Sequence, residues 1–406
     1  MRNTEPNKSV SISEIVVTGL GMISAIGNSV SANRDSLKAG VCGISTLQNF
    51  PSRFSGILPC GEIKINTTPL KQKLSAFEPG ITRTDLLCLH AFREAVSDAG
   101  LTEDDIMSAD TAFINGNTVG GMCLTDELYH DANKDEKGSE YLSSYDCSAV
   151  TLYIQSRYKM NGIANTINTA CSSSANAIMY GARLINNGFA TRAIVGGVDS
   201  LAKFTLNGFN ALHILSPELC RPFDQNRQGL NLGEGAAFLV LEKKQDAKDK
   251  SIHAVLRGSS NTNDAFHPSS LSPEGDGPYL AMKNALDTAS LKSADISFVN
   301  THGTGTENND EVESKAMIKI FDSMPPFSST KSNTGHTLGA AGALEAIYSI
   351  LNLKYQEVYP SLNFADPAPE TGLRPVSEYK KMAINHVMSN SFGFGGNCSS
   401  LISSKA

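Results

Sequence analysis

Short runs of apolar and β-branched residues, each ending in a Gly- or Ser-rich turn, alternate along the chain with segments in which apolar residues recur every three or four positions. The first pattern predicts buried strands, and the second predicts helices with one buried face. Alternation of the two over most of the length indicates a protein built of α/β layers. The predicted strands are 15–18, 164–169, 193–196, 296–300 and 327–330.

Three of these strands lead through a polar loop into a predicted helix. Apolar residues with helical spacing follow two of these loops. After Cys171 they are Ala175, Ile178, Met179, Ala182 and Ile185, and after His302 they are Val312, Ala316, Met317, Ile320 and Phe321. The third helix, 338–353, is largely apolar and begins with the small residues 339–343, which permit close packing. We therefore predict that the third helix is buried.

Composition narrows the class of protein. The chain has 406 residues, of which 40% are hydrophobic and 18% charged, so it is long enough for a substantial core and too apolar to be disordered. Its 34 Lys and Arg against 41 Asp and Glu give a net charge of -7, which gives no reason to expect nucleic acid or an anionic membrane as a partner. The apolar stretch 15–26 is interrupted by Thr, Gly and Ser, and therefore resembles neither a signal-peptide core nor a membrane span.

The densest charge cluster between apolar strands is the segment 242–250. We interpret this segment as a join, which predicts an N-terminal half at 1–250 and a C-terminal half at 251–406. A solvated helix face would give the same charge pattern.

The eight cysteines are widely scattered and include no Cys-x-x-Cys pair. This spacing argues against zinc ribbons and thioredoxin-type redox chemistry, and it is typical of reduced thiols, so we expect a cytoplasmic protein. We interpret seven of the cysteines as buried apolar thiols, and Cys171 as the exception.

Three predicted strand ends carry reactive residue types. They are the turns 168–174, 300–306 and 329–336, which contain Cys171, His302 and His336. Because ligands bind at the carboxyl edge of α/β sheets, we expect these turns to converge. Cys171 stands at a helix start, where free N–H groups and the helix dipole favour a thiolate and provide an oxyanion site.

Other chemistries fit this residue set less well. A zinc site formed by one Cys and two His lacks any ligand-spacing signature. A cysteine protease would leave His336 and Lys331 without a role. A dinucleotide fingerprint fails because Ser24 stands where a third Gly is required, and the chain has no Walker-type loop.

Five ordered motifs carry a resemblance to a known family. They read NTACSSS at 168–174, RPFDQNRQGLNLGEGAA at 221–237, THGTGT at 301–306, STKSNTGHTLGAAGALE at 329–345 and NSFGFGG at 390–396. In order and spacing they resemble the β-ketoacyl-acyl-carrier-protein synthases I and II, over nearly the entire chain and only loosely in its first 150 residues. The resemblance implies the thiolase fold, an α/β fold of two similar halves in five α-β-α-β-α layers. Members usually form a homodimer whose interface lies near the active sites.

The resemblance also implies a decarboxylating condensation. Cys171 would attack the thioester of an acyl-acyl-carrier protein, while backbone N–H groups of Cys171 and Phe394 hold the oxyanion. Malonyl-acyl-carrier protein would then lose CO2, and hydrogen bonds from His302 and His336 would stabilise the resulting enolate. The enolate would attack the acyl group on Cys171 and give a 3-oxoacyl-acyl-carrier protein.

Supporting roles follow from the same resemblance. Lys331 would supply positive charge and organise the site with Glu345. Thr304 and Thr306 would hydrogen-bond the phosphopantetheine arm, although hydroxyls that only cap the turn would look the same in sequence.

The glycine-rich motif and a separate valine are implied to control the acyl chain. Phe394, flanked by Gly393 and Gly395, would form a gate that opens when Cys171 is acylated, whereas a β-bulge with a core Phe is the alternative. Val119 would narrow the far end of the acyl tunnel.

Some residues depart from the family pattern. Asn397-Cys398 stands where Thr-Asn is usual, and Gly305 and Glu307 stand where Ser and Pro are common. None of these removes a catalytic group, but they suggest a branch that builds polyenes or other specialised acyl chains rather than housekeeping fatty acids.

Three rival assignments remain within the fold. A chain-length factor, a non-condensing partner subunit of a heterodimeric synthase, would lack the nucleophile that Cys171 provides. Thiolase places its nucleophile much nearer the N-terminus. The third class of synthases pairs His with Asn, whereas this chain has His336 in that place.

The expected partners follow from the chemistry. The carrier protein is acidic and brings its own phosphopantetheine, so we expect no bound cofactor and no metal. Its docking patch should contain Lys and Arg, for which Arg83, Lys71 and Lys73 are candidates. The second subunit would be another copy or a related synthase subunit.

Overall fold

The computed structural model describes residues 14–134, 136 and 138–406, so the first thirteen residues of the predicted N-terminal half lie outside the described part. The strands are β1 (Ile15–Ser24), β2 (Thr111–Gly116), β3 (Ala164–Ile167), β4 (Arg192–Asp199), β5 (Gly235–Lys243), β6 (Ala254–Asn263), β7 (Phe298–Asn300), β8 (Phe327–Ser328), β9 (Glu357–Val358), β10 (Lys380–Lys381), β11 (His386–Phe392) and β12 (Asn397–Ser404).

The α-helices are α1 (Val30–Lys38), α2 (Thr67–Leu74), α3 (Arg83–Asp98), α4 (Glu103–Met107), α5 (Thr125–Lys134), α6 (Ala149–Arg157), α7 (Ser173–Asn186), α8 (Lys203–Ala211), α9 (Asp276–Ala289), α10 (Glu307–Ile320), α11 (Lys331–Thr334) and α12 (Ala341–Tyr355). Short 3-10 helices are η1 (Met122–Leu124), η2 (Leu142–Ser144), η3 (Lys244–Asp246), η4 (Ser293–Asp295), η5 (Leu338–Ala340) and η6 (Phe394–Gly396).

The main sheet contains the same strand arrangement twice. Its order is β3-β2-β4-β5-β1-β6-β12-β11-β7-β8, so the first five strands read 3-2-4-5-1 and the second five, taken from the other edge, read 8-7-11-12-6. In each half the two edge pairs are parallel and the next two pairs are antiparallel. The halves meet where β1 pairs with β6 over only three residues. This duplication is not evident from the sequence.

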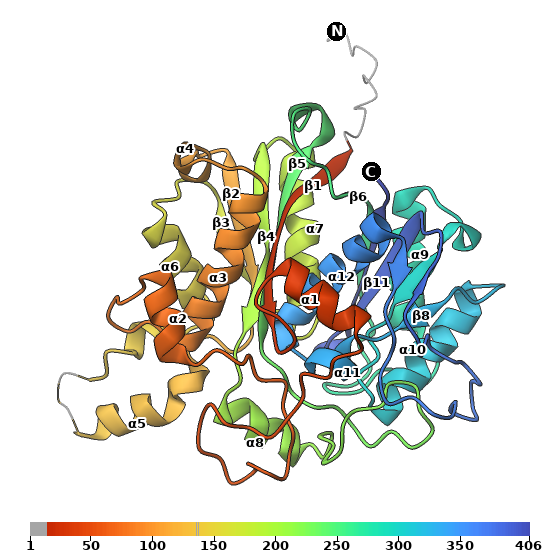
Figure 1. The fold of residues 1–406 in the computed structure, drawn as a ribbon, viewed down its shortest axis with the longest axis horizontal. Coiled ribbons are helices and arrows are strands. Elements are labelled where there is room, and N and C mark those ends of the chain that lie inside the picture. The colour runs from red at the N-terminus through yellow and green to blue at the C-terminus, as the bar shows by residue number, and fades with distance from the viewer. Residues whose placement is uncertain (1–13, 135, 137) are drawn as a thin grey trace, which may run out of the picture.

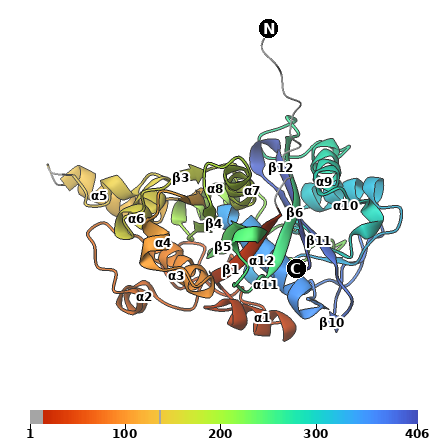
Figure 2. The same ribbon diagram turned by 90° about the horizontal axis from the view of Figure 1, so that it is seen from above.

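Helices α7 and α12 pack against each other in the middle of the molecule. Helix α7 lies on β2 and β4 of the first half, and α12 lies on β11 of the second half as well as on β5. On the outer faces, α3 covers β1 and β5, and α9 covers β6 and β12 (Figures 1 and 2). The layers therefore run α-β-α-β-α, which confirms the expected five-layer arrangement.

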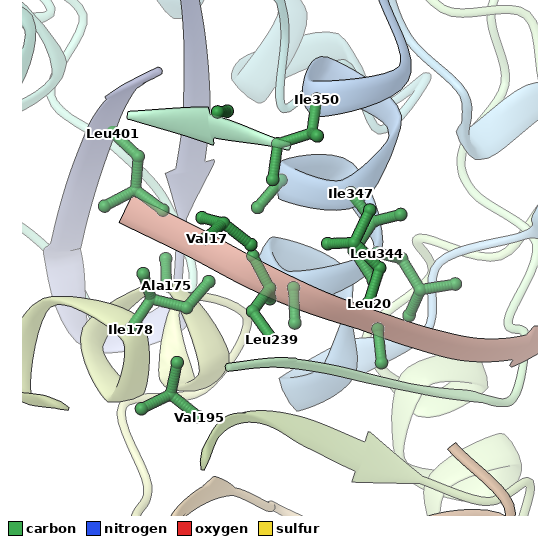
Figure 3. Packing of buried hydrophobic residues seen from close by; sticks show 14 of the residues in the cluster. Val17, Leu20, Ala175, Ile178, Val195, Leu239, Leu344, Ile347, Ile350 and Leu401 are labelled. Atoms are coloured by element: carbon green, nitrogen blue, oxygen red, sulfur yellow. The ribbon is translucent and has the colours of Figure 1, made fainter. Parts of the chain in front are cut away.

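The largest apolar cluster surrounds the two central helices. Leu344, Ile347 and Ile350 of α12 face Val17 and Leu20 of β1 in Figure 3. Ala175 and Ile178 of α7 belong to the same buried cluster. The third predicted helix is therefore buried, as its composition predicts, because strands of both halves cover it.

Strand β1 is longer than predicted. The predicted strand ends at Thr18, yet the strand continues through Gly19 and Gly21 to Ser24. The glycines belong to the strand because α3 lies directly on it: a Cβ at Gly21 would come within 2.1 Å of the Ala91 carbonyl oxygen.

Two further sequence expectations meet the structure here. Cys42, Cys123 and Cys147 are only partly buried, so the interpretation of all seven remaining cysteines as buried thiols is wrong for these three. The charged segment 242–250 runs from the end of β5 through η3 toward β6, where the two halves connect. No helix among the described residues is long and apolar enough to cross a membrane.

Replacing Gly21 with Ala should destabilise the fold. The added methyl would force β1 away from α3, and overpacking of this kind costs about 2 kcal/mol. Gly208→Ala is the matched control, because Gly208 lies in α8 with open space around it, and its effect should stay within about 1 kcal/mol. Urea unfolding of both variants measures the free energy of unfolding, and equal values would contradict the close-packing explanation.

Candidate active site

The turn that carries Cys171 joins β3 to α7. Ala170 has a positive φ of 51°, so the chain reverses sharply and places Cys171 just before the helix. The Thr169 backbone N–H donates to Ser173 Oγ at 2.9 Å, which holds the turn against the first residue of the helix. The Cys171 side chain is buried, with 6% exposure.

His336 reaches Cys171 from the loop after α11. Gly335 has a φ of 73°, which turns the chain just before His336. The His336 backbone N–H donates to the Asn231 carbonyl at 2.7 Å, which holds the loop in place. His336 Nε2 lies 3.0 Å from Cys171 Sγ. His336 Nδ1 is buried without a hydrogen-bond partner among the described residues, so none of these neighbours fixes the ring's tautomer.

His302 follows β7 and faces His336. Both oxygens of Glu313 accept backbone N–H groups of this turn, from His302 at 2.9 Å and from Gly303 at 2.8 Å. The two imidazole rings stand edge to face with centroids 5.4 Å apart. The sequence therefore predicted correctly that the two histidine turns converge on Cys171.

Lys331 connects the His302 turn to Glu345 of α12. Its Nζ donates to the His302 carbonyl at 2.6 Å and lies 3.3 Å from His302 Nδ1. It also forms a buried ion pair with Glu345 of α12. Because an ammonium can only donate, Nδ1 of His302 accepts and the imidazole proton resides on Nε2.

Burial controls the protonation of these groups. It raises the pKa of Cys171 to about 11, although Lys331 and the backbone N–H groups of Phe394 and Cys171 act in the opposite direction. Burial, reinforced by the Lys331 charge, holds the pKa values of His302 and His336 well below the ordinary range. The expected thiolate at the helix start is therefore wrong for the resting site, because loss of solvation outweighs the helix N-terminus.

Phe394 closes one side of the site. Its backbone N–H and that of Cys171 both lower the pKa of the Cys171 thiol, so both favour negative charge at this point, as the donors of an oxyanion hole must. Its ring stacks on Phe209 of α8, with centroids 5.7 Å apart and 13° between the planes. Gly393 lets the loop approach the nucleophile, since a Cβ there would lie 2.7 Å from Thr169 O, and Gly395 has a φ of 80°.

A cleft of about 530 Å³ opens onto these groups. Its lining includes Cys171, His302, His336, Gly393 and Phe394. Thr304 and Thr306 also line it, and their hydroxyls lie 2.8 Å apart. Several other lining residues have no role predicted from the sequence; they are Phe209, His213, Ile214, Gln228, Ser269, Ser270 and Asn308.

Several predicted positions do not line this cleft, among them Lys331, Glu345 and Gly395 as well as Val119 and Arg83. Val119 is buried, and its backbone N–H donates to Asp199 Oδ1 at 2.8 Å. Arg83 is also buried and pairs with Glu234, so its assignment to a docking patch is wrong. No sequence signal indicated that the partner of Arg83 would be a glutamate 151 positions away.

Cys171, His302 and His336 could together hold a metal ion, because their ligand atoms all lie within 4.8 Å of one another. The Lys331 ammonium beside His302 opposes a cation there. The absence of a metal stays a prediction.

Comparison with known proteins gives a consistent result. Residues 13–247 match the family described as "Beta-ketoacyl synthase, N-terminal domain" and residues 253–365 match its C-terminal domain. The 3-oxoacyl-[acyl-carrier-protein] synthase 2 of Staphylococcus aureus is 33% identical, over 96% of this chain and 98% of that protein.

Solved structures of similar proteins have the same fold as this chain. The ishigamide ketosynthase/chain length factor superposes with a TM-score of 0.91 at 30% identity, covering 98% of this chain and 100% of the other. A ketosynthase from Xenorhabdus doucetiae, solved in complex with its chain length factor, gives 0.86 at 31% identity with both chains fully covered. The predicted thiolase fold is confirmed.

The pH dependence of Cys171 alkylation tests the protonation scheme. Because burial raises the pKa of Cys171 to about 11, the rate of its reaction with iodoacetamide should keep rising from about pH 7 to about pH 10. Lys331→Met should shift this rise to higher pH, since the Lys331 charge lowers the pKa of the thiol. Mass spectrometry of the Cys171 peptide separates it from the other cysteines, and a plateau near neutral pH would contradict the scheme.

Removing the Phe209 ring, which stacks on Phe394, should let the Phe394 loop move and make Cys171 more accessible. Stacked aromatic pairs contribute about 1 kcal/mol, so Phe209→Ala should raise the alkylation rate of Cys171 by up to about tenfold. Phe204→Ala is the control, because Phe204 lies in the same helix but is 55% exposed. Equal rates in both variants would show that the stack does not hold the gate.

Proposed function

Because this chain belongs to the β-ketoacyl synthase family, we propose that it condenses an acyl group held on Cys171 with malonyl-acyl-carrier protein, releasing CO2 and a 3-oxoacyl-acyl-carrier protein. The observation that carries the proposal is the contact between Cys171 and His336, with His302 and Lys331 completing the site. A nucleophile, two neutral imidazoles and a fixed cation suit a reaction that passes through an oxyanion and then an enolate.

The first half-reaction transfers the acyl chain. As the Cys171 sulfur attacks the thioester carbonyl, His336 Nε2 accepts the thiol proton. His336 then gives this proton to the departing sulfur of the carrier, which leaves as a thiol. Burial, reinforced by the Lys331 charge, holds the pKa of His336 well below the ordinary range, so the ring is neutral and Nε2 has a lone pair free to take the Cys171 proton. The backbone N–H groups of Cys171 and Phe394 stabilise the oxyanion of the tetrahedral intermediate.

The second half-reaction forms the carbon–carbon bond. Malonyl thioester loses CO2, and its electron pair becomes an enolate whose oxygen accepts hydrogen bonds from His302 Nε2 and His336 Nε2. Lys331 holds His302 in the donating tautomer, and the free tautomer of His336 allows Nε2 to donate in this step. The enolate carbon attacks the acyl carbonyl, and the Cys171 sulfur leaves as a thiolate that takes a proton from water.

Substrate delivery involves the polar part of the cleft. Thr304 and Thr306 present hydroxyls to a phosphopantetheine arm entering from an acyl-carrier protein, so the enzyme needs no resident cofactor. Lys71 and Lys73 of α2 remain candidates for carrier docking. Val119 is proposed to limit chain length from its buried position beyond the cleft.

The chain is proposed to work as a dimer in the cytoplasm. Its eight cysteines are free thiols, as expected for a reducing compartment. A partner that is a second copy or a related subunit is supported by the Xenorhabdus doucetiae ketosynthase, which was solved with its chain length factor. The alternative that this chain is itself a non-condensing factor is disfavoured because Cys171, both histidines and Lys331 are all present.

Condensation can be tested directly. The protein is mixed with malonyl-acyl-carrier protein and acyl-carrier proteins charged with saturated and unsaturated chains of graded length, and CO2 release and product mass are followed. We expect a product two carbons longer, with the length profile separating fatty-acid from polyene-type substrates. Cys171→Ala should form no product, because it cannot carry the acyl group.

His302→Ala keeps the nucleophile and refines the result. It should still be acylated on Cys171, while condensation falls at least about a hundredfold through loss of an enolate donor. If wild type forms no product with any primer and copurifies with a second synthase subunit, the stand-alone reaction is wrong.

A further inference from the structure

Asn397 lies where the loop that carries Phe394 (the gate loop) meets the turn that carries Cys171 (the nucleophile turn). Its backbone carbonyl accepts the Gly393 N–H at 2.7 Å, which closes the loop that presents Phe394. Its side-chain Oδ1 lies 2.7 Å from Ser172 Oγ, the residue directly after Cys171. One residue therefore contacts the immediate chain neighbours of both oxyanion donors.

The side-chain oxygen is held from three directions. Besides Ser172, it accepts Asn176 Nδ2 of α7 at 2.9 Å and Asn261 Nδ2 of β6 at 2.6 Å. The Ser172 hydroxyl lies between two acceptors, this oxygen and the Thr169 carbonyl at 2.8 Å, and it donates its one proton to either of them. The contacts from α7 and β6 hold the Asn397 oxygen beside the nucleophile turn.

The two oxyanion donors come from different halves of the chain. Cys171 is fixed by α7, and Phe394 precedes β12, so their separation depends on contacts between these segments. Gly393 brings the backbones together but supplies no side chain, and a Cβ there would lie 3.2 Å from the Cys171 nitrogen. Asn397 binds both segments, Gly393 through its backbone carbonyl and Ser172 through its side chain, and is therefore able to set their spacing.

We propose that Asn397 is a positioning residue for acyl transfer, which fixes the Phe394 N–H relative to the Cys171 N–H through its bonds to Gly393 and Ser172. The proposal rests on the function given above.

The test compares two reactions of the same sulfur. Acylation by octanoyl-acyl-carrier protein develops an oxyanion, whereas alkylation by iodoacetamide does not. Asn397→Leu keeps the side-chain size but accepts no hydrogen bond, and it should slow acyl transfer about tenfold or more without slowing alkylation. The KM for the carrier protein should remain near that of the wild type, because the substrate-binding cleft is unchanged.

Two variants serve as controls. Asn397→Asp keeps an acceptor in place and should recover most of the lost rate. Asn261→Ala removes a donor to the same oxygen from β6 and leaves the bond to Ser172, so its acyl transfer should stay close to wild type.

Several results would overturn the proposal. They are a parallel fall of acylation and alkylation in Asn397→Leu, an unchanged acylation rate, an equal loss in Asn397→Asp, or an equal loss in Asn261→Ala. A wild type that accepts no acyl group at all would instead contradict the proposed function, so the two failures are distinguishable.

Discussion

The Lys331 ammonium is a charge removed from water, and the arrangement of the site depends on it. Its side chain is 2% exposed, so its solvation must be replaced by fixed partners. The His302 carbonyl, the His302 ring and the Glu345 carboxylate provide them. These contacts set the tautomer of one imidazole, lower the pKa of both, and connect the site to the central helix α12.

The duplicated architecture explains why these groups meet. The Cys171 turn follows β3, the His302 turn follows β7, and the Lys331 segment follows β8, and all three strands belong to parallel pairs. Parallel strands deliver their following loops to one edge of a sheet. Helices α7 and α12, each leading away from one of these turns, pack on each other and bring the two edges together.

The sequence predicted those parts of the site in which chemistry and local pattern coincide. Cys171, His302 and His336 each stand between a strand pattern and a helix pattern, so their convergence could be expected. Phe209 lies in an ordinary amphipathic helix and His213 in a turn with no motif, and only tertiary packing brings them to the cleft. The neutral state of Cys171 was also beyond the sequence, because the helix start is a local feature whereas burial is a property of the whole fold.

The short pairing of β1 with β6 has a consequence for how the protein loses activity on heating. Only three residue pairs continue the sheet across the two halves, while each half has its own ladder of strands. The nucleophile belongs to one half, and the imidazoles and the cation belong to the other. The alignment of the two halves therefore depends on the packing of α7 and α12 between them, and loosening of that packing would separate these groups while leaving both ladders intact. Thermal inactivation is therefore expected to begin below the temperature at which secondary structure melts.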